Sequence, residues 1–253
     1  MRYRNRNTVC ASSQIGCPIG CAFCATGRRG FVRNLTSGEI TAQVLHFAGK
    51  LREENARVTN VVFMGMGEPM LNFNAVWQTI CNLKHPDGLG LGARRFTIST
   101  AGVVPGIERL ARRSRSIGLA ISLHAPDNAL RDKLVPINKR YPLEHLISAS
   151  KFYVRRTGRR VTFEYALIQA VNDSDDHARR TAELLRGLLC HVNLIPLNPI
   201  PGSVYEPSQR DRVLRFQQML ARGHIQATVR APRGLNIQAG CGQLRERRLG
   251  AVH

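Results

Sequence analysis

Three closely spaced cysteines near the N-terminus are the strongest chemical signal in this sequence. Cys17, Cys21 and Cys24 follow the spacing Cys-x3-Cys-x2-Cys. Three thiolates this close together can bind three irons of a cubane cluster and leave the fourth iron without a protein ligand. That iron can chelate the amino and carboxylate groups of S-adenosylmethionine, and one electron passed to the sulfonium then yields a 5′-deoxyadenosyl radical. We therefore predict a 4Fe–4S cluster and S-adenosylmethionine as cofactors.

A zinc site is the main alternative for these cysteines. Zinc takes four ligands in structural sites and commonly pairs two Cys-x2-Cys units. Cys10 could supply a fourth thiolate, but its distance from Cys17 along the chain is unusual for a zinc knuckle. Three clustered ligands with an x3–x2 spacing favour the cluster, because only a cluster uses an iron that the protein leaves open.

A glycine-rich turn, Gly-Met-Gly-Glu-Pro at 65–69, is the second signal. It follows the apolar segment 58–64, which has the length of a buried strand. Glycine lets the backbone approach a ligand closely, and the Glu68 carboxylate could accept hydrogen bonds from the ammonium group of the cofactor. Because such turns are common after strands, the motif supports the cofactor only together with the cysteine loop.

Segments rich in β-branched residues alternate with helical patterns along the chain. Strands are expected at 8–12, 58–64, 95–99, 119–123, 161–168, 192–197 and 226–229. Helices are expected from the capping box 36–39 to 54, and at 74–83, 105–113, 143–155, 176–189 and 208–221. About six βα units in a row indicate a parallel α/β sheet. It is either a partial or full βα barrel or an open doubly wound sheet.

Each polar motif directly follows a predicted strand, so all of them are expected at the C-terminal ends of strands. They are the cysteine loop, the turn 65–69, Ser99, His124 and Asn198. In a barrel, chemistry collects at the C-terminal ends of the strands. His124 is equally compatible with a structural role, since a neutral imidazole serves either purpose. Cys81 and Cys190 lie in helical apolar patterns and are expected in the core.

The amino-acid composition indicates the class of binding partner and the cellular compartment. The 253 residues suit one domain, and 37 Lys and Arg against 17 Asp and Glu give a net charge of +20. Such an excess favours nucleic acid as the partner. The chain has no apolar run long enough to span a membrane, and its basic N-terminus lacks the apolar stretch of a secretory signal. Seven cysteines in a long chain disfavour a secreted disulfide scaffold, so we expect the cytoplasm.

In combination, these motifs resemble the radical S-adenosylmethionine superfamily and, more narrowly, the RlmN/Cfr family of rRNA adenine methyltransferases. The resemblance is carried by segments 10–17, 17–24, 65–72, 99–105, 122–125, 163–165, 193–199 and 239–244. It implies a partial (β/α)6 TIM-like barrel. It also implies one core domain, 1–253, with a methyl-carrier segment around 234–244.

The resemblance also implies roles for individual residues. Cys17, Cys21 and Cys24 would bind the cluster. The S-adenosylmethionine site would be lined by Gly67, Glu68, Ser99, Ser122, Leu123, His124 and Asn198. Cys241 would carry a methyl group taken from a first cofactor molecule, because a thiolate is nucleophilic enough to accept it and an adenine C–H is not. Cys10 would release the product by forming a disulfide with Cys241.

The implied product is adenine methylated at C2, favoured over C8, in 23S rRNA and also in tRNA. A flavodoxin or ferredoxin would donate electrons to a monomeric enzyme. Family members carry an N-terminal RNA-binding domain and an upstream glutamate general base, and both would fall before Met1. We therefore expect that domain to be absent and turnover to be impaired. The alternatives are a radical enzyme acting on a non-RNA substrate and a non-catalytic zinc- or RNA-binding module.

Overall fold

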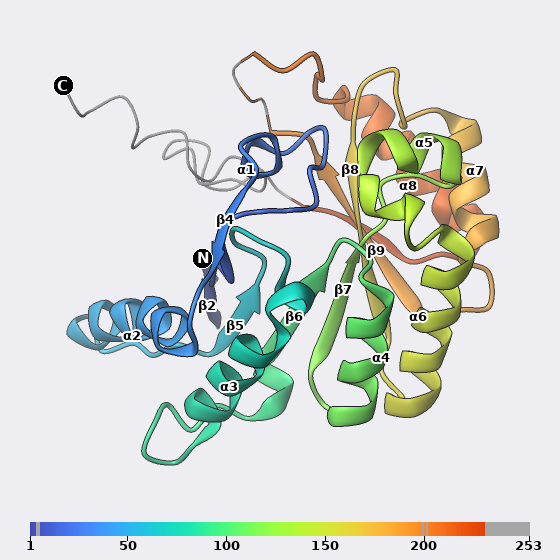
Figure 1. Cartoon of the computed structure of the whole chain (residues 1–253). Helices are drawn as coiled ribbons and strands as arrows, with labels where there is room; N and C mark the ends of the chain where they lie inside the picture. Colours follow the sequence, from blue (N-terminus) through green and yellow to red (C-terminus); the bar gives the residue numbers. More distant parts are fainter. Residues whose placement is uncertain (4–5, 199, 201, 231–253) are drawn as a thin grey trace.

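The computed structural model describes residues 1–3, 6–198, 200 and 202–230. Cys241 and the predicted methyl-carrier segment 234–244 lie outside the described residues. A curled, largely parallel sheet forms the centre of the described part, and the helices cover its outer side (Figure 1). Within the described residues, no helix is both long and apolar enough to cross a membrane.

The main sheet follows the order of the chain. Its strands, from one edge to the other, are β1 (Arg2–Tyr3), β2 (Arg6–Cys10), β5 (Asn60–Phe63), β6 (Phe96–Thr100), β7 (Gly118–Ser122), β8 (Val161–Leu167), β9 (Cys190–Pro196) and β10 (Ala227–Val229). β1 pairs antiparallel with β2, and every later neighbour pairs in parallel. A sequential order excludes a doubly wound sheet, in which the strand order reverses. The predicted partial (β/α)6 barrel is therefore confirmed.

Helices connect the parallel strands. They are α2 (Ser37–Glu53), α3 (Phe73–Lys84), α4 (Val104–Arg113), α5 (Asn128–Leu134), α6 (Leu143–Thr157), α7 (Asp175–Leu184) and α8 (Arg210–Arg222). Each buries one face: in α4, Ile107 and Leu110 are fully buried while Arg109 and Arg113 are exposed. The strands meet these faces with β-branched and aromatic side chains such as Phe163, so burial of apolar surface holds the layers together.

The capping box that the sequence predicts is present at the start of α2. The Thr36 hydroxyl accepts a hydrogen bond from the backbone N–H of Glu39, and the Glu39 carboxylate accepts one from the backbone N–H of Thr36. Two N–H groups that would lack partners at a helix start are thereby satisfied. This fixes where the cysteine loop ends and the first crossover helix begins.

Several short elements were not predicted. The segment expected to be a loop contains β3 (Gln14–Gly16) and β4 (Phe31–Asn34), which pair antiparallel, and α1 (Ala25–Arg28) between them. All four residues of β4 are exposed, so the segment carries no alternation of buried and exposed side chains. α5 and the 3-10 helices η1 (Pro69–Asn72), η2 (Ala93–Arg95) and η3 (Pro136–Lys139) are too short for a periodic signal.

One expectation about the core is wrong. Cys81 is exposed, because it lies on the outer side of α3 while Ile80 and Leu83 face the sheet. A cysteine with apolar neighbours in the sequence is therefore not always buried. Its position around the helix axis decides whether it faces the core. Cys190 begins strand β9 rather than lying in a helical segment, because α7 ends at Leu184 and not at 189 as predicted. It is half-buried and packs against the main core.

Candidate active site

One pocket at the C-terminal ends of the parallel strands gathers nearly all the predicted cofactor residues. Those that line it are Cys17, Cys21, Cys24, Gly67, Glu68, Ser99, Ser122, His124 and Asn198. They come from the cysteine loop and from the ends of β5, β6, β7 and β9, segments distant in sequence. A parallel barrel brings strand ends together at one rim, so this convergence follows from the topology.

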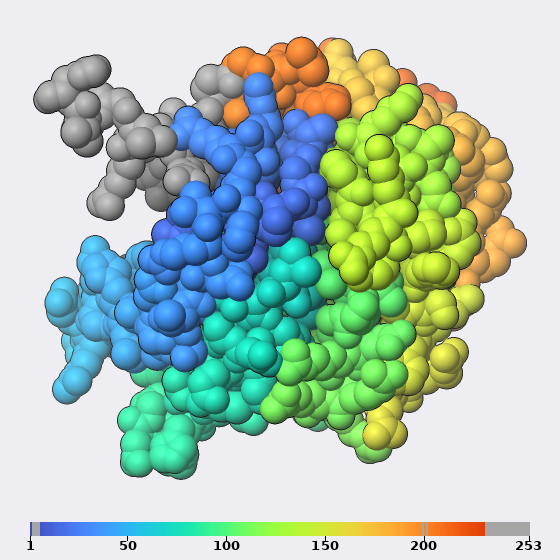
Figure 2. All heavy atoms as spheres, viewed as in Figure 1, coloured from blue at the N-terminus to red at the C-terminus, as the bar shows by residue number. Residues whose placement is uncertain are grey.

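The cysteine loop packs onto the rim from one side. Cys17, Cys21 and Phe23 contact an apolar cluster that includes Leu134 and Val135, at the C-terminal end of α5. The backbone N–H of Ala22 donates to the Leu134 carbonyl at 3.1 Å. In Figure 2 the blue N-terminal segment accordingly lies against the yellow-green segment at the upper rim. The loop is thus held by apolar contacts and by its own hairpin rather than by cysteine cross-links.

The three cysteines lie close enough to influence one another electrostatically. Burial raises the pKa of the Cys17 thiol to about 12. Burial also raises the pKa of Cys21, and the neighbouring Cys24 and Cys17 thiols raise it further. Since thiols with raised pKa values keep their protons at neutral pH, a metal must displace those protons when it binds.

The three cysteines are a donor set that fits an iron–sulfur cluster. Cys17, Cys21 and Cys24 form no disulfide and line one pocket. A cubane places each thiolate on a different iron, so three thiols at one pocket suit it. A structural zinc site would need four ligands around one ion.

Glu68 is held by the backbone of two strand ends. Its Oε2 accepts a hydrogen bond from the N–H of Ala101 at 2.7 Å, and its Oε1 accepts one from the N–H of Met70 at 3.0 Å. Burial raises the pKa of this carboxyl to about 7, while the two N–H groups act in the opposite direction. The Thr100 side chain also hydrogen-bonds this carboxyl and lowers its pKa. A carboxylate has about four lone-pair positions, so these three contacts leave one that can accept from an ammonium group.

Gly67 is one of two positions in the turn that require glycine; at the other, Gly65, a Cβ would lie 2.8 Å from the carbonyl oxygen of Ala11. The φ of Gly67 is +100°, and a Cβ there would lie 2.5 Å from the Cβ of Gln14. Gln14 must stay close, because its side-chain oxygen accepts the backbone N–H of Glu68 at 2.8 Å. The close approach of these two segments therefore orients Glu68.

His124 serves the fold and lines the pocket at once. Its Nδ1 accepts a hydrogen bond from the N–H of Ala166 at 2.9 Å, and its ring packs edge-on against Phe23 with centroids 4.8 Å apart. Burial, followed by the positive charge of Arg131, lowers its pKa to about 3. The imidazole is therefore neutral, with its proton on Nε2.

Arg131 supports the rim, and sequence reasoning missed it. The guanidinium is fully buried and donates to the carbonyls of Leu123, Ala101 and Ser122 at 3.0, 2.7 and 2.8 Å. It also donates to the side-chain oxygen of Asn138 at 2.8 Å. One planar cation thus satisfies carbonyls from two strand ends. No sequence pattern indicated this role, because a single arginine in a short helix resembles a solvated one.

Asn172 is a second missed support. Its amide nitrogen donates to the carbonyls of His124 and Ala166 at 2.8 and 2.7 Å, and its oxygen accepts from the N–H of Ile168 at 2.7 Å. This fully satisfied side chain fixes the loop after β8 against the end of β7. Its hydrogen bonds reach across the fold, so the local sequence gave no signal.

Two predicted site residues lie outside the pocket, and a third falls outside the described residues. The Leu123 side chain is fully buried in the main hydrophobic core and does not line the pocket, because it alternates with Ser122 across the strand. Cys10 is exposed at the end of β2, outside the pocket. Cys241 lies outside the described residues, so its position relative to Cys10 stays a prediction.

Known proteins share this fold and its motifs. A family model for the radical SAM superfamily matches residues 12–182. A crystal structure of a radical SAM methyltransferase from Sphaerobacter thermophilus superposes with a TM-score of 0.95 at 54% identity, covering 97% of this chain and 72% of that one. SuiB of Streptococcus suis, solved with bound S-adenosylmethionine, gives a TM-score of 0.65 at 14% identity, over 90% of this chain and 51% of that one, and shares the fold alone.

Curated relatives match over most of the chain. The "Ribosomal RNA large subunit methyltransferase N" of Nitrosopumilus maritimus is 51% identical over 240 residues, which is 95% of this chain and 68% of the relative. The "Probable dual-specificity RNA methyltransferase RlmN" of Moorella thermoacetica is 52% identical over 244 residues, which cover 96% of this chain and 69% of the relative. Fold and site together thus define a radical SAM protein. Within that superfamily, the chain belongs to the RlmN family.

Proposed function

We propose that this chain methylates a carbon of adenine in RNA, with 23S rRNA as the main substrate and tRNA as a second one. C2 is favoured over C8. The observation that carries the proposal is the convergence of Cys17, Cys21 and Cys24 on one pocket with Glu68 and Asn198. The close relatives named as RNA methyltransferases support it, as does the charge of +20.

The chain's own residues would hold the cofactors. Cys17, Cys21 and Cys24 would ligate the cluster, and Glu68 would bind the cofactor's ammonium group with the lone pair that its other contacts leave. When bound, the cluster and S-adenosylmethionine supply a 5′-deoxyadenosyl radical. The hydroxyl of Ser122 lines the same pocket and would orient the cofactor.

Two cysteines outside the cluster would carry the methyl group. The Cys241 thiolate would first accept a methyl group as a nucleophile. After a hydrogen atom is removed from that group, the resulting carbon radical would bond to the adenine carbon. The adduct would lose the proton of that carbon to a base and one electron to a one-electron acceptor, such as the oxidised form of the flavodoxin or ferredoxin proposed below. The Cys10 thiolate would then attack the sulfur of Cys241, so that a disulfide forms as the carbon–sulfur bond breaks, and the released carbon would take up a proton to complete the methyl group. Cys10 is exposed, which leaves it accessible for this step.

RNA would approach over a basic rim. Arg28 and Arg29, at the end of α1, are exposed beside the cysteines. Phosphate contacts of this kind make binding weaken steeply with added salt. We further propose a cytoplasmic monomer that takes electrons from a flavodoxin or ferredoxin.

The test is an anaerobic assay of the reconstituted protein with methyl-deuterated S-adenosylmethionine and either a 23S rRNA fragment or tRNA. Mass spectrometry of digested RNA should detect a methylated adenine and distinguish C2 from C8. Cys241→Ala should abolish the product, and Cys10→Ala should accumulate a covalent protein–RNA adduct. Cys81→Ala, at an exposed cysteine remote from the pocket, serves as the control.

The outcomes separate the parts of the proposal. If wild-type protein with an intact cluster never labels Cys241, the methylated-cysteine route is wrong. Formation of 5′-deoxyadenosine without any RNA product would instead indicate a radical enzyme with a non-RNA substrate. Zinc without iron or sulfide after anaerobic purification would exclude radical chemistry.

A further inference from the structure

The loops at the end of the barrel opposite the cysteine loop are strongly basic. They hold eleven arginines and one lysine but only one acidic residue, Asp87. A surface with this imbalance attracts a polyanion. We name these loops the basal arc; they precede β6, β7, β8, β9 and β10 and cover residues 84–95, 112–117, 155–160, 185–190 and 222–226.

The sheet order joins the loops of the basal arc into one surface. β6 to β10 are parallel and neighbour one another in chain order, so the loops before them lie side by side. In Figure 1 the loops before β6, β7 and β8 lie at the lower edge, and the cysteine loop lies near the upper edge. The 7 residues of β8 separate the two ends by about 20 Å, at about 3.3 Å per residue. The basal arc is therefore distinct from the pocket.

The cations of the basal arc are exposed and are not neutralised by acids of the chain. Among its arginines and its lysine, all of which the structure describes, only Arg159 is half-buried and only Arg112 forms an ion pair, with Glu108 at 3.2 Å. The charge is different at the cofactor end of β8, where the loop 168–176 carries three aspartates and no basic residue. An arginine without an acid partner can turn its planar fork of donors toward a phosphate.

Two arginines of the basal arc lie against aromatic rings. The guanidinium carbon of Arg113 is 5.0 Å from the ring centroid of Trp77, and that of Arg112 is 5.4 Å from the ring centroid of Phe152. Contact with a ring face holds a long side chain in place and leaves the N–H groups at the guanidinium edge accessible. These donors therefore lose little conformational freedom when they bind a phosphate.

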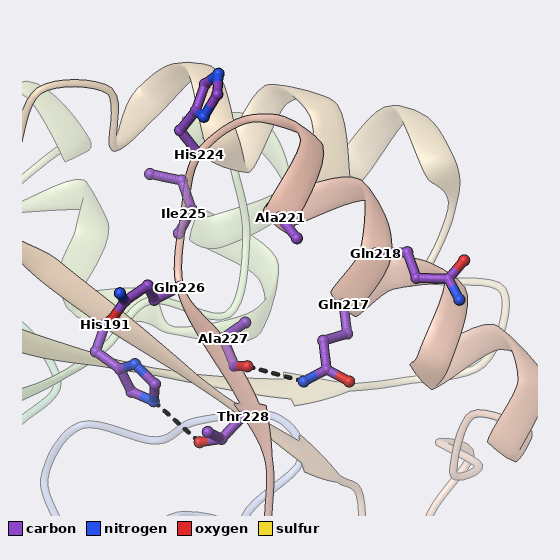
Figure 3. Close-up of a pocket in the computed structure, with 9 residues that line it drawn as sticks. All are labelled: His191, Gln217, Gln218, Ala221, His224, Ile225, Gln226, Ala227 and Thr228. Atoms are coloured by element: carbon purple, nitrogen blue, oxygen red, sulfur yellow. Dashed lines mark hydrogen bonds between the residues drawn. The ribbon is translucent and has the colours of Figure 1, made fainter.

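A groove between α8 and β10 continues the basal arc at its last loop (Figure 3). Its volume is about 630 Å³, and its polar lining includes His191, Gln217 and Gln226. The Thr228 hydroxyl donates to Asn193, so it accepts from Nε2 of His191 at 2.9 Å, which leaves Nδ1 as an acceptor. Nδ1 is buried, and no donor in the described part of the chain reaches it. Such an acceptor favours a ligand with a donor, and a ribose hydroxyl or a base amine supplies one.

We propose that the basal arc binds a single-stranded segment of the substrate RNA remote from the modified adenine, with phosphates on the arginines and one nucleoside in the groove of His191. This inference rests on the proposed function only in that the partner is RNA. Arginine matches phosphate bidentately, and an acidic electron donor would have to approach the cysteines at the other end, so RNA is favoured over an acidic protein. A second contact on the same RNA raises the effective concentration of the target at the pocket.

Binding of a 23S rRNA fragment to the full chain, measured by fluorescence anisotropy over a range of salt concentrations, tests the phosphate contacts. Arg155→Gln combined with Arg156→Gln should weaken binding about tenfold. It should also reduce the slope of log affinity against log salt by about 1.4, since each phosphate contact on a single strand contributes about 0.7. The matched control is Lys50→Gln with Arg52→Gln. It removes the same charge from the last turn of another helix, α2, and should leave affinity and slope nearly unchanged.

His191→Phe tests the groove, because it keeps a ring and removes the Nδ1 acceptor. It should weaken binding of the same fragment about fivefold without changing the salt slope, since the lost contact carries no charge. His46→Phe, at an exposed position on α2, is the control and should leave the affinity unchanged. An unaffected His191→Phe variant overturns the contact in the groove. A short hairpin that carries only the target adenine and its neighbours should bind wild type and all variants equally, because it cannot reach the basal end.

Unchanged affinity and slope in the Arg155–Arg156 variant overturn the proposal, as does an equal loss in the α2 control. A loss that extends to the short hairpin would place these arginines at the target and also overturns it. If RNA binding is unchanged but reduced flavodoxin transfers electrons to the cluster more slowly, the surface serves an acidic protein and the proposal is wrong. A wild type that binds the fragment through the basal arc but methylates no adenine would reject the proposed function and leave this inference standing.

Discussion

The carboxylate of Glu68 accepts a hydrogen bond from the backbone N–H of Ala101 at 2.7 Å and thereby joins the ends of β5 and β6. The same carboxylate accepts the N–H of Met70, so one side chain fixes the turn after β5 and the start of the loop after β6. Burial raises the pKa of Glu68 to about 7 in spite of these two donors. A residue placed to receive the cofactor therefore changes its charge near neutral pH.

The titration of Glu68 should make the stability of the cofactor-free protein depend on pH. Its folded pKa of about 7 exceeds its usual value of 4.5, so its contribution is fully present below about pH 4.5 and is lost as pH rises toward 7. The loss should be on the order of 3 kcal/mol at about 1.4 kcal/mol per pKa unit. Urea denaturation across this range measures it.

Glu68→Gln provides the reference for that experiment, because it cannot titrate. The variant differs in absolute stability, since an amide can accept only one of the two N–H groups, so the shapes of the two pH profiles are compared. Parallel profiles for wild type and variant would mean that burial does not shift this carboxyl.

Gly67→Ala should destabilise the protein and weaken cofactor binding. A Cβ at φ +100° is strained and would lie 2.5 Å from Gln14, which cannot withdraw without releasing the N–H of Glu68. We expect a loss of about 2–4 kcal/mol from strain and overpacking together. Gly49→Ala, in helix α2 with open space around it, should stabilise by about 0.5–1 kcal/mol. Equal effects of the two variants in urea denaturation would argue against the tight turn.

Arg131→Lys should cost about 2–4 kcal/mol although the charge is kept. Lysine cannot reproduce the planar fork that reaches three carbonyls and Asn138 at once, so buried acceptors lose their donors. Arg140→Lys, at an exposed position, should change stability by less than about 0.5 kcal/mol. If chemical denaturation shows that neither substitution changes the free energy of unfolding, then the positive charge at position 131, and not the guanidinium geometry, stabilises the strand ends.

Cys21→Ser should abolish cluster assembly. The protein should bind about four irons per chain after anaerobic reconstitution, and the variant below about one, because a cubane held by two protein thiolates is poorly retained. Iron and sulfide analysis, with absorbance of the sulfide-to-iron bands, measures this. The matched control is Cys81→Ser on the exposed side of α3, which should retain full iron. Iron retained at the wild-type level in the Cys21 variant contradicts the assignment.

Periodicity located the parallel strands and the long helices to within a few residues, because each must bury a continuous apolar face. The capping box set the start of α2 at Ser37. The same reasoning missed β3, β4 and α5, whose shortness leaves no period to detect, and it placed the exposed Cys81 in the core. Tertiary packing outweighed local pattern at each of these positions.

The sequence by itself determined which reactive groups the protein has. They are three thiols at a spacing that suits a cluster, a carboxylate after a glycine-rich turn, and an excess of basic residues that suits a polyanion. Spacing along the chain is enough to identify such a ligand set, because residues that are close in sequence are close in space in any fold. Only the tertiary structure decided which distant side chains join them. The buried fork of Arg131 depends on how helix α5 packs against the ends of β6 and β7. The shared face of Ser122, Glu164 and Asn193 depends on strand register, which sets the side of the sheet on which each residue projects.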